Sequence, residues 1–177
     1  MKKILIVYKS KTGFTKRYVD WICEEVTCDT RTLNETKSSD IDKYDIIIYG
    51  AGIRAGFISG LKKFKKLVDI NNKKVIVFAT GAVAKSDDMI QPVIENNLAD
   101  CKSRVGFFYF ESGICYEKMG AFSRGMMRIF SKMLNAKKDK SEIDEEMSKA
   151  IMSSFDNSKK ENIESLVTLL KEYYKFW

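Results

Sequence analysis

The sequence contains no histidine among its 177 residues. Histidine is the commonest general base near neutral pH, and it completes most serine and cysteine triads. Its absence argues against those mechanisms. We therefore expect any chemistry to be carried by a cofactor or by other side chains, and we assign no catalytic residue from the usual bases.

Cysteine and proline are scarce as well. The four cysteines, which form no C-x-x-C pair, are Cys23, Cys28, Cys101 and Cys115. Without histidine they lack the ligand spacing of a structural zinc site, so we expect no bound metal. The single proline, Pro92, predicts that a helix begins close to it, because proline fits the first turn of a helix.

The sequence also lacks a long hydrophobic run, and none approaches the length of a membrane-spanning helix. At the N-terminus, Lys2 and Lys3 precede a short apolar run, and Lys9 and Lys11 follow it at once. This pattern predicts a buried first strand and not a signal peptide. We expect a cytoplasmic protein.

The charge is unbalanced, with 31 lysine and arginine residues against 24 acidic residues, a net charge of +7. Such a surplus favours an anionic partner, which can be an acidic small molecule, a membrane surface or nucleic acid. A solvated lysine-rich surface explains the charge without a partner, and for the charge alone we prefer that explanation. The lysines show no interleaved aromatic residues, so we expect no nucleic acid.

Length and composition favour one globular domain spanning residues 1–177. Short apolar runs predict buried strands at residues 4–8, 44–49, 74–79 and 105–110, with a short edge strand at 30–33. Apolar residues at helical spacing lie between them, at residues 19–26, 61–68 and 90–98. Because strands alternate with helices, the sequence predicts an α/β fold with a doubly wound parallel sheet covered on both faces.

The segment between the last strand and the last helix is longer than a simple loop. It covers approximately residues 112–157 and is predicted to be a helical insert. Its first helix is expected at Met119–Leu134, and a second is expected to be capped by Ser141. The final helix is predicted to begin at a capping box formed by Ser158 and Glu161.

Three segments follow buried strands and are predicted to meet at one edge of the sheet. They are Lys9–Thr15, Ala51–Ser59 and Thr80–Asp88. In the first, three hydroxyl side chains precede a helix, whose first N–H groups are unpaired and suit a phosphate. Gly13 allows the backbone to curl around such an anion. The alternative is a hydroxyl-rich turn in which Thr12 or Thr15 only caps the helix, and we favour the phosphate site.

Other phosphate loops fit this sequence less well. There is no G-x-x-x-x-G-K-[ST] motif, and the glycines at 50, 52 and 56 do not form G-x-G-x-x-G. A response-regulator receiver needs an acidic cluster after the first strand, where Lys9 and Lys11 stand instead. A low-molecular-weight tyrosine phosphatase needs a cysteine in this loop, and none is present.

The six residues Ser10–Thr15 resemble the loop [ST]-x-T-G-x-T that holds the FMN phosphate in flavodoxins. This resemblance to the flavodoxin-like family implies a five-stranded parallel sheet of order 2-1-3-4-5, with FMN as the cofactor. It implies cofactor contacts from the three strand-end segments. The expected residues are Ser10, Lys11, Thr12, Gly13, Phe14 and Thr15, then Ala51, Gly52, Ile53, Arg54 and Phe57, and finally Thr80, Gly81 and Ala82.

The segment Gly50–Gly56 resembles the G-[AS]-x-I-R-x-G motif of the menaquinone-dependent protoporphyrinogen oxidases, a branch of flavodoxin-like enzymes. Ser123–Met133 is similar in composition to the basic, methionine-rich helix in the insert of that branch. The resemblance implies an FMN-dependent oxidoreductase of haem biosynthesis. It would oxidise protoporphyrinogen IX and pass the electrons to a quinone or another acceptor.

The sequence departs from electron-carrying flavodoxins, which are usually acidic and enclose the flavin between two aromatic side chains. Here the second segment offers only Phe57, the third offers no aromatic residue, and Tyr116 of the insert is a weaker candidate. Arg54 can pair with a substrate carboxylate, bond the flavin edge or only brace its loop. The alternative function stays open: a flavodoxin-type electron-transfer protein that docks acidic redox partners.

The expected helix Met119–Leu134 is amphipathic. Its apolar arc consists of Phe122, Met126, Ile129, Phe130 and Met133, and its basic stripe of Arg124, Arg128 and Lys132. With no acidic residue, the helix suits a peripheral position on an anionic membrane, at the inner membrane face, or a grip on a partner. The alternative, which we prefer at this point, is that the apolar arc covers the edge of the sheet.

Overall fold

A computed structural model describes residues 3–136 and 152–175. Its main sheet has five parallel strands in the order β2-β1-β3-β5-β6. Their bounds are Asp29–Thr32 (β2), Ile4–Lys9 (β1), Ile46–Arg54 (β3), Lys74–Gly81 (β5) and Val105–Glu111 (β6). The predicted α/β fold and strand order are confirmed.

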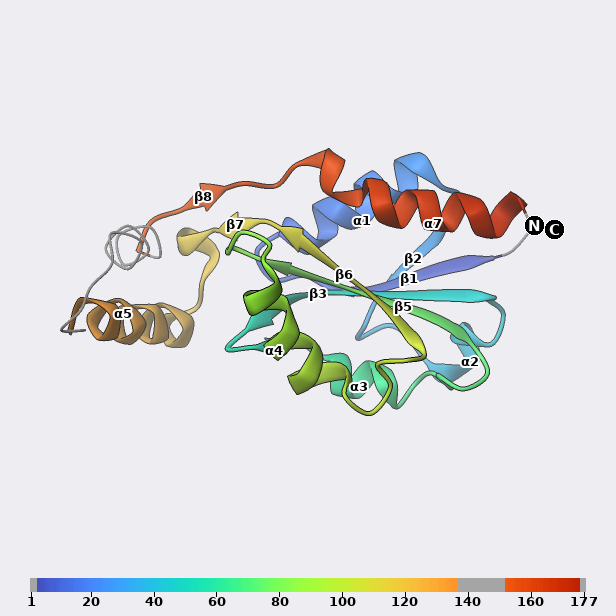
Figure 1. Ribbon diagram of the computed structural model, residues 1–177, viewed down its shortest axis with the longest axis horizontal. Helices are drawn as coiled ribbons and strands as arrows, with labels where there is room; N and C mark the ends of the chain where they lie inside the picture. The colour runs from blue at the N-terminus through green and yellow to red at the C-terminus, as the bar shows by residue number, and fades with distance from the viewer. Residues whose placement is uncertain (1–2, 137–151, 176–177) are drawn as a thin grey trace.

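Helices cover both faces of this sheet (Figure 1). One face carries α1 (Phe14–Glu25) and α7 (Glu164–Lys175), and the other carries α3 (Leu61–Lys65) and α4 (Asp87–Leu98). A short helix, α2 (Ser38–Ile41), precedes β3. Successive strand residues point to opposite faces, so the apolar run of β1 supplies both hydrophobic clusters of the core.

Aromatic rings fill the face beneath α1 and α7. The Phe78 ring lies over Gly50, where an added Cβ would come within 2.1 Å of it. The centroids of Phe78 and Phe110 are 5.1 Å apart, and those of Phe110 and Tyr18 are 5.0 Å apart. A glycine in the central strand β3 therefore makes room for a continuous row of aromatic side chains.

The second strand-end segment differs from the loop that was predicted for residues 51–59. Strand β3 continues to Arg54 and pairs with the antiparallel strand β4 (Phe57–Ile58). Ala55 and Gly56 form the turn, with φ angles of 47° and 79°. Two positive φ angles define the tight hairpin turn that matches the twist of its strands. Arg54 and Phe57 therefore lie directly opposite each other at the tip.

Helix α4 begins earlier than Pro92 predicted. Ser86 is its N-cap, and the side-chain oxygen of Ser86 accepts a hydrogen bond from the backbone N–H of Met89. Pro92 lies inside the helix, five residues after its first residue, Asp87. The serine cap and the two aspartates in the first turn, which favour the positive end of the helix dipole, fix the start.

The predicted capping box of Ser158 and Glu161 does not form. The backbone N–H of Ser158 donates to Asp156 Oδ1 at 2.9 Å. Lys159 is the N-cap of a short 3₁₀ helix, η2 (Lys160–Ile163), and makes no side-chain cap. The Asp156 carboxylate accepts from the backbone of Ser158 and shapes the turn before η2. Ser158 therefore does not cap the helix with its side chain.

The insert leaves the sheet at its carboxyl end. It contains β7 (Gly113–Ile114), η1 (Tyr116–Lys118), α5 (Ala121–Ala136) and β8 (Phe155–Asp156). Strand β8 pairs with β7 in antiparallel fashion. The first predicted helix of the insert is confirmed as α5, whereas the one predicted from Ser141 falls largely outside the described residues.

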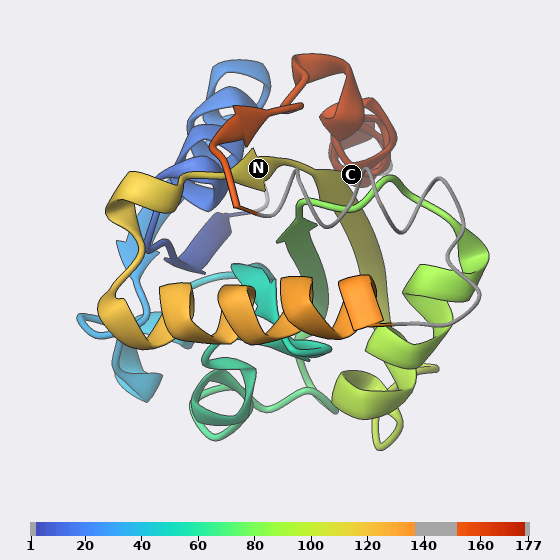
Figure 2. The same ribbon diagram turned by 90° about the vertical axis from the view of Figure 1, so that its left-hand side faces the viewer.

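Helix α5 lies at one end of the molecule, beyond the carboxyl ends of the strands, and passes across that end (Figures 1 and 2). No helix in residues 3–136 and 152–175 is long and apolar enough to cross a membrane.

Candidate functional site

The strand order reverses between β1 and β3. From there β2 lies on one side, and β5 and β6 lie on the other. Lys9, the last residue of β1, pairs with Ala51 of β3, so the first strand-end segment leaves the sheet beside the second. In open parallel sheets ligands bind in the crevice at such a reversal, outside the carboxyl ends of the strands.

The first segment forms a tight loop into α1. Gly13 is the N-cap with φ 102°, and a Cβ at this position would meet no atom within 4 Å. The N–H of Lys16 donates to Ser10 Oγ at 3.3 Å. Gly13 is the N-cap residue and has no side chain, so neither Thr12 nor Thr15 serves as the cap, and the alternative in which one of them does is wrong. The start of α1 therefore presents backbone N–H groups beside open space.

A pair of buried hydroxyl groups joins the first and third segments. Thr15 and Thr80 are each 3% exposed, and their Oγ1 atoms are 3.0 Å apart. A Cβ on Gly52 would lie 3.7 Å from Thr80 Oγ1, so the end of β3 adjoins the same pair. The structure thus brings one residue from each of the three predicted segments together.

The first segment is positively charged. Lys9 and Lys11 are exposed, and residues 4–19 contain no aspartate or glutamate. Lys16 is paired with Asp20 at 2.7 Å, and the hydrogen bond that Lys16 Nζ donates to this carboxylate raises the pKa of Lys16. Lys9 and Lys11 are therefore the nearby cations that a bound anion would meet first.

The predicted site residues differ in exposure. The structure buries Phe14, Thr15, Ala51 and Thr80, half-buries Ser10, Thr12, Gly52, Ile53, Gly81 and Ala82, and exposes Lys11, Gly13, Arg54 and Phe57. Ala51 belongs to the hydrophobic core beneath α3 and α4. Its methyl group is therefore unavailable to a ligand, and only its backbone can take part.

The tip of the β3–β4 hairpin carries the two predicted side chains of the second segment. Phe57 is 51% exposed. Arg54 Nη2 donates to Ser123 Oγ of α5 at 2.6 Å. Arg54 therefore braces the hairpin against the insert, which was one of the three roles expected for it.

Side chains that the sequence did not single out hold the hairpin in place. Asn97 of α4 accepts from Ile58 N and donates to Gly56 O, each at 2.8 Å. Tyr49 OH donates to Ser59 O at 2.6 Å. Burial raises the pKa of the Tyr49 phenol, so the proton in this bond stays in place at any physiological pH.

The third segment is held by β6 and by the insert. Tyr109 OH donates to Val83 O, and a Cβ on Gly81 would lie 2.7 Å from Tyr109 OH. Ala82 packs against a small hydrophobic cluster centred on Ile114, which also contains Tyr116. Tyr116 is half-buried in this cluster, so Tyr116 of the insert and Ala82 of the third segment pack against the same side chain, Ile114.

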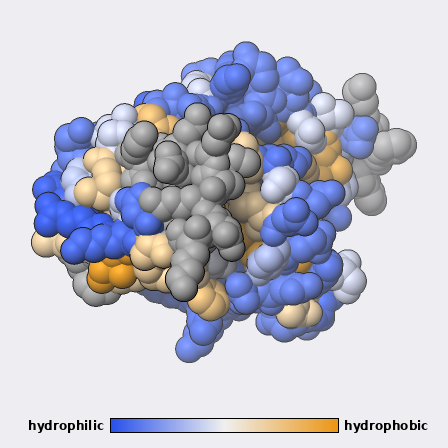
Figure 3. Space-filling model, turned by 60° about the vertical axis from the view of Figure 1, so that its left-hand side comes forward, coloured by the Kyte–Doolittle hydropathy of each residue, from blue (hydrophilic) through white to orange (hydrophobic). Residues whose placement is uncertain are grey.

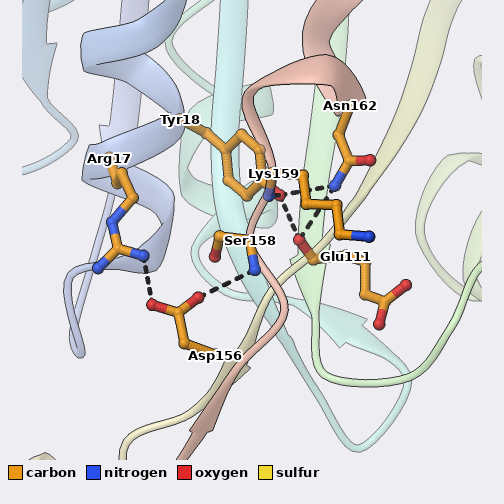
Figure 4. A network of polar contacts seen from close by, with 7 residues as sticks. All are labelled: Arg17, Tyr18, Glu111, Asp156, Ser158, Lys159 and Asn162. Carbon is orange, nitrogen blue, oxygen red and sulfur yellow. Dashed lines mark hydrogen bonds and ion pairs between the residues drawn. The ribbon is translucent and has the colours of Figure 1, made fainter.

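A polar network ties the returning end of the insert to α1 (Figure 4). Tyr18 OH donates to the carbonyl of Glu111 and accepts from Asn162 Nδ2 at 2.8 Å and from Lys159 N at 3.3 Å. Arg17 forms an ion pair with Asp156 of β8. The signal in the sequence was Tyr18 itself, because a hydroxyl on the apolar stripe of a helix must find partners.

Comparison with known families gives one match. The family model described as "Flavodoxin domain" matches residues 5–141, which is more than half of the chain. No curated protein matches the chain.

Several solved structures are similar to this chain. Oxidised flavodoxin 2 from Bacillus cereus is 22% identical with a TM-score of 0.47, covering 62% of this chain and 84% of that one. Trp repressor binding protein from Bacillus subtilis is 16% identical with a TM-score of 0.48, covering 62% and 84%. A flavoprotein in complex with FMN from Lactobacillus acidophilus NCFM is 16% identical with a TM-score of 0.43, covering 63% and 93%.

Proposed function

This chain belongs to the flavodoxin domain family, and we propose that it binds FMN at the carboxyl end of its sheet and acts as an FMN-dependent oxidoreductase. The observation that carries the proposal is the start of α1. A glycine in the left-handed conformation is the N-cap, so it offers no side chain to the first N–H groups of the helix, and a Cβ on this glycine would meet no atom within 4 Å.

The residues present fit the phosphate of FMN. The first N–H groups of α1 point along the helix axis, where the positive end of the helix dipole favours an anion. Ser10 Oγ accepts from Lys16 N, so its own proton is left to donate. Thr12 is half-buried in the same loop. Lys9 and Lys11 add charge of the required sign.

The other two segments would receive the ring. Gly52 has no side chain, so a flat group can approach the backbone of β3 closely, whereas Tyr109 fills the space beside Gly81. Phe57 is the exposed aromatic side chain that would stack on the ring. The pair of Thr15 and Thr80 would fix the spacing between the phosphate loop and this ring site.

Bound FMN supplies a ring that accepts and donates one or two electrons. The protein contributes position and charge, because it has no histidine to serve as a general base. Arg54 is exposed beside Phe57 at the hairpin tip, where its guanidinium can attract a carboxylate on a flat substrate. An arginine beside an aromatic ring suits a flat substrate with carboxylates, such as protoporphyrinogen IX, which carries propionates. A quinone or another molecule would then accept the electrons.

The binding proposal is tested by titrating the purified full-length protein with FMN and with riboflavin, following the quenching of flavin fluorescence. Because riboflavin lacks the phosphate, we expect it to bind at least about a hundredfold more weakly. Equal affinity for the two ligands, or no binding, would contradict the assignment.

Two variants localise the phosphate. Ser10→Ala and Thr12→Val should each weaken FMN binding about tenfold, because each removes a hydrogen bond to a charged group. Neither should change riboflavin binding. Thr30→Val, on the exposed surface of β2, is the matched control and should bind FMN like the wild type.

A second experiment separates the oxidoreductase from an electron carrier that docks acidic redox partners, which the net charge of +7 would also suit. The FMN-loaded protein is mixed, without oxygen, with protoporphyrinogen IX and a quinone as the electron acceptor, and the fluorescence of the oxidised porphyrin is compared with a sample that lacks the protein. Porphyrin formation that Arg54→Gln slows, with FMN affinity unchanged, supports the enzyme. No porphyrin, together with rapid reduction by an acidic redox protein, supports the carrier.

A further inference from the structure

Helix α5 leaves a row of apolar side chains in solvent. Met126, Ile129 and Met133 are 48%, 56% and 63% exposed. They are spaced by three and four residues, so they form one stripe along the helix. Isolated exposed apolar residues are ordinary, but a contiguous stripe on one helix marks an interaction surface.

The attachment of α5 explains why this stripe faces outward. Ser123 bonds to Arg54, and Met127 packs in the cluster centred on Ile114. Those two contacts fix which side of the helix meets the protein. The expectation that the apolar arc would cover the edge of the sheet is therefore wrong for its three described members, Met126, Ile129 and Met133.

Basic side chains flank the stripe. Arg128 and Lys132 are exposed, and Ala121–Ala136 contains no acidic residue. Arg124, the third basic residue, is used within the insert, where it donates to Glu117 O at 2.8 Å and lies over the Tyr116 ring. Figure 3 shows hydrophobic residues directly beside strongly hydrophilic ones on this side of the molecule.

We propose that this face of α5 docks on the surface of an anionic lipid bilayer. Such a surface has lipid phosphates above an apolar layer of acyl chains. The basic flank of α5 can meet the phosphates while the apolar stripe meets the acyl chains. Met126, Ile129 and Met133 enter the boundary of the acyl chains. Arg128 and Lys132 reach the phosphates with their charged ends while their stems lie along the apolar layer.

Charge distinguishes the bilayer from a second copy of this chain. A symmetric pair would place α5 against α5, and Arg128 and Lys132 of one copy would face the same cations of the other. No acidic residue on α5 could compensate them. A bilayer containing anionic lipid meets both the apolar and the charged parts of the face.

The test is sedimentation of the full-length protein with vesicles. One set contains phosphatidylcholine mixed with phosphatidylglycerol, and the other contains phosphatidylcholine alone. We expect binding to the anionic vesicles, much weaker binding to the neutral ones, and partial loss at high salt. Protein that stays in the supernatant with both sets would overturn the proposal.

Variants separate α5 from the general positive charge of the chain. The triple change Met126→Ser, Ile129→Ser and Met133→Ser should lower binding at least about tenfold. The double change Arg128→Gln and Lys132→Gln should lower it about fivefold per charge. The matched control removes Lys62 and Lys66, two exposed lysines on and beside α3, as glutamines and should have little effect.

Three further outcomes, all from the variants, would overturn the proposal. One is equal loss of binding in the control and in the α5 charge variant, which means attraction by net charge alone. Another is a triple serine variant that binds like the wild type. The last is concentration-dependent self-association that the triple serine change abolishes, since a second copy then occupies the face. An unchanged unfolding temperature in each variant shows that the fold is intact.

Discussion

The sheet and the insert use apolar residues in opposite ways. In β1, β3 and β5 the apolar side chains are almost completely buried, because helices cover both faces. In α5 a comparable pattern of apolar residues leaves Met126, Ile129 and Met133 about half exposed. Hydrophobic periodicity therefore shows which side of a helix or strand is apolar. It does not show whether another part of the fold covers that side.

The largest difference between the two regions should appear in stability. Phe78→Ala removes a fully buried ring from the aromatic row and should lower the free energy of unfolding by about 3–5 kcal/mol. Ile129→Ala on α5 should change it by less than about 0.5 kcal/mol. Urea denaturation of both variants checks the contrast. A loss above about 2 kcal/mol for Ile129→Ala would mean that α5 packs more tightly than described.

The Tyr18 hydroxyl of α1 joins the sheet region to the chain that returns from the insert, through its bonds to Glu111, Lys159 and Asn162. Tyr18→Phe should cost about 1–3 kcal/mol, because the carbonyl of Glu111 and the amide of Asn162 lose a buried partner. Tyr44→Phe is the matched control, since its hydroxyl bonds to Asp29 near the surface and should be worth much less. Hydrogen exchange should show faster opening of residues 157–163 only in Tyr18→Phe. Equal losses of stability in the two variants would contradict a special contribution from the Tyr18 hydrogen bonds.

The hairpin tip that faces α5 carries a strained residue. Ala55 has φ 47°, in the left-handed region that asparagine tolerates better than alanine. Ala55→Asn should therefore raise the free energy of unfolding by about 0.5–1 kcal/mol. Ala99, with φ −51° at the end of α4, is the control, and Ala99→Asn should bring no gain. A loss of stability in Ala55→Asn would refute the turn geometry.

The smallest expected effect concerns pH and the ion pair between α1 and β8. Partial burial disfavours the Asp156 carboxylate, but hydrogen bonds from Arg17 and Ser158 outweigh it and lower the pKa below its ordinary value of 3.8. A lowered carboxyl pKa stabilises the fold above the unfolded value, and this contribution is lost as the pH falls through the folded value.

Because the pair is partly exposed, its contribution should be roughly 0.5 kcal/mol. Asp156→Asn should therefore lower the unfolding temperature slightly at neutral pH and should approach the wild type as the pH falls below 3.8 and through the lowered folded pKa. Thermal unfolding from neutral to acid pH measures this. A difference that persists at the acid end would show that the pair does not act through its charge.

The strands themselves and the start of α1 could be predicted because both depend on local patterns, whereas the order of the strands followed from the resemblance to flavodoxins. An apolar run such as Ile4–Tyr8 has few structural alternatives, and Gly13 with its neighbouring hydroxyls marks the start of a helix. The extension of β3 to Arg54 could not be predicted in this way. Glycines at 50 and 52 resemble a loop in the sequence, but both pair with the neighbouring strand β5, and the Phe78 ring fills the space above Gly50.

Tertiary contacts decided the remaining differences. Ser158 had the spacing of a capping box, yet Asp156 and Tyr18 hold that part of the chain instead. The apolar arc of α5 resembled a core-facing stripe, and the Arg54–Ser123 bond turns its described members outward. Each of these contacts joins residues distant in sequence or depends on the orientation of a whole element, so no local pattern contains it.

The most direct test of the account is a crystal structure of the protein grown with FMN. The account predicts the phosphate at the start of α1, bonded to backbone N–H groups of the loop from Ser10 to Thr15, with the ring beside the β3–β4 hairpin and the Thr80–Ala82 segment. A phosphate elsewhere on the molecule, or FMN absent from crystals grown at saturating ligand, would contradict the central claim.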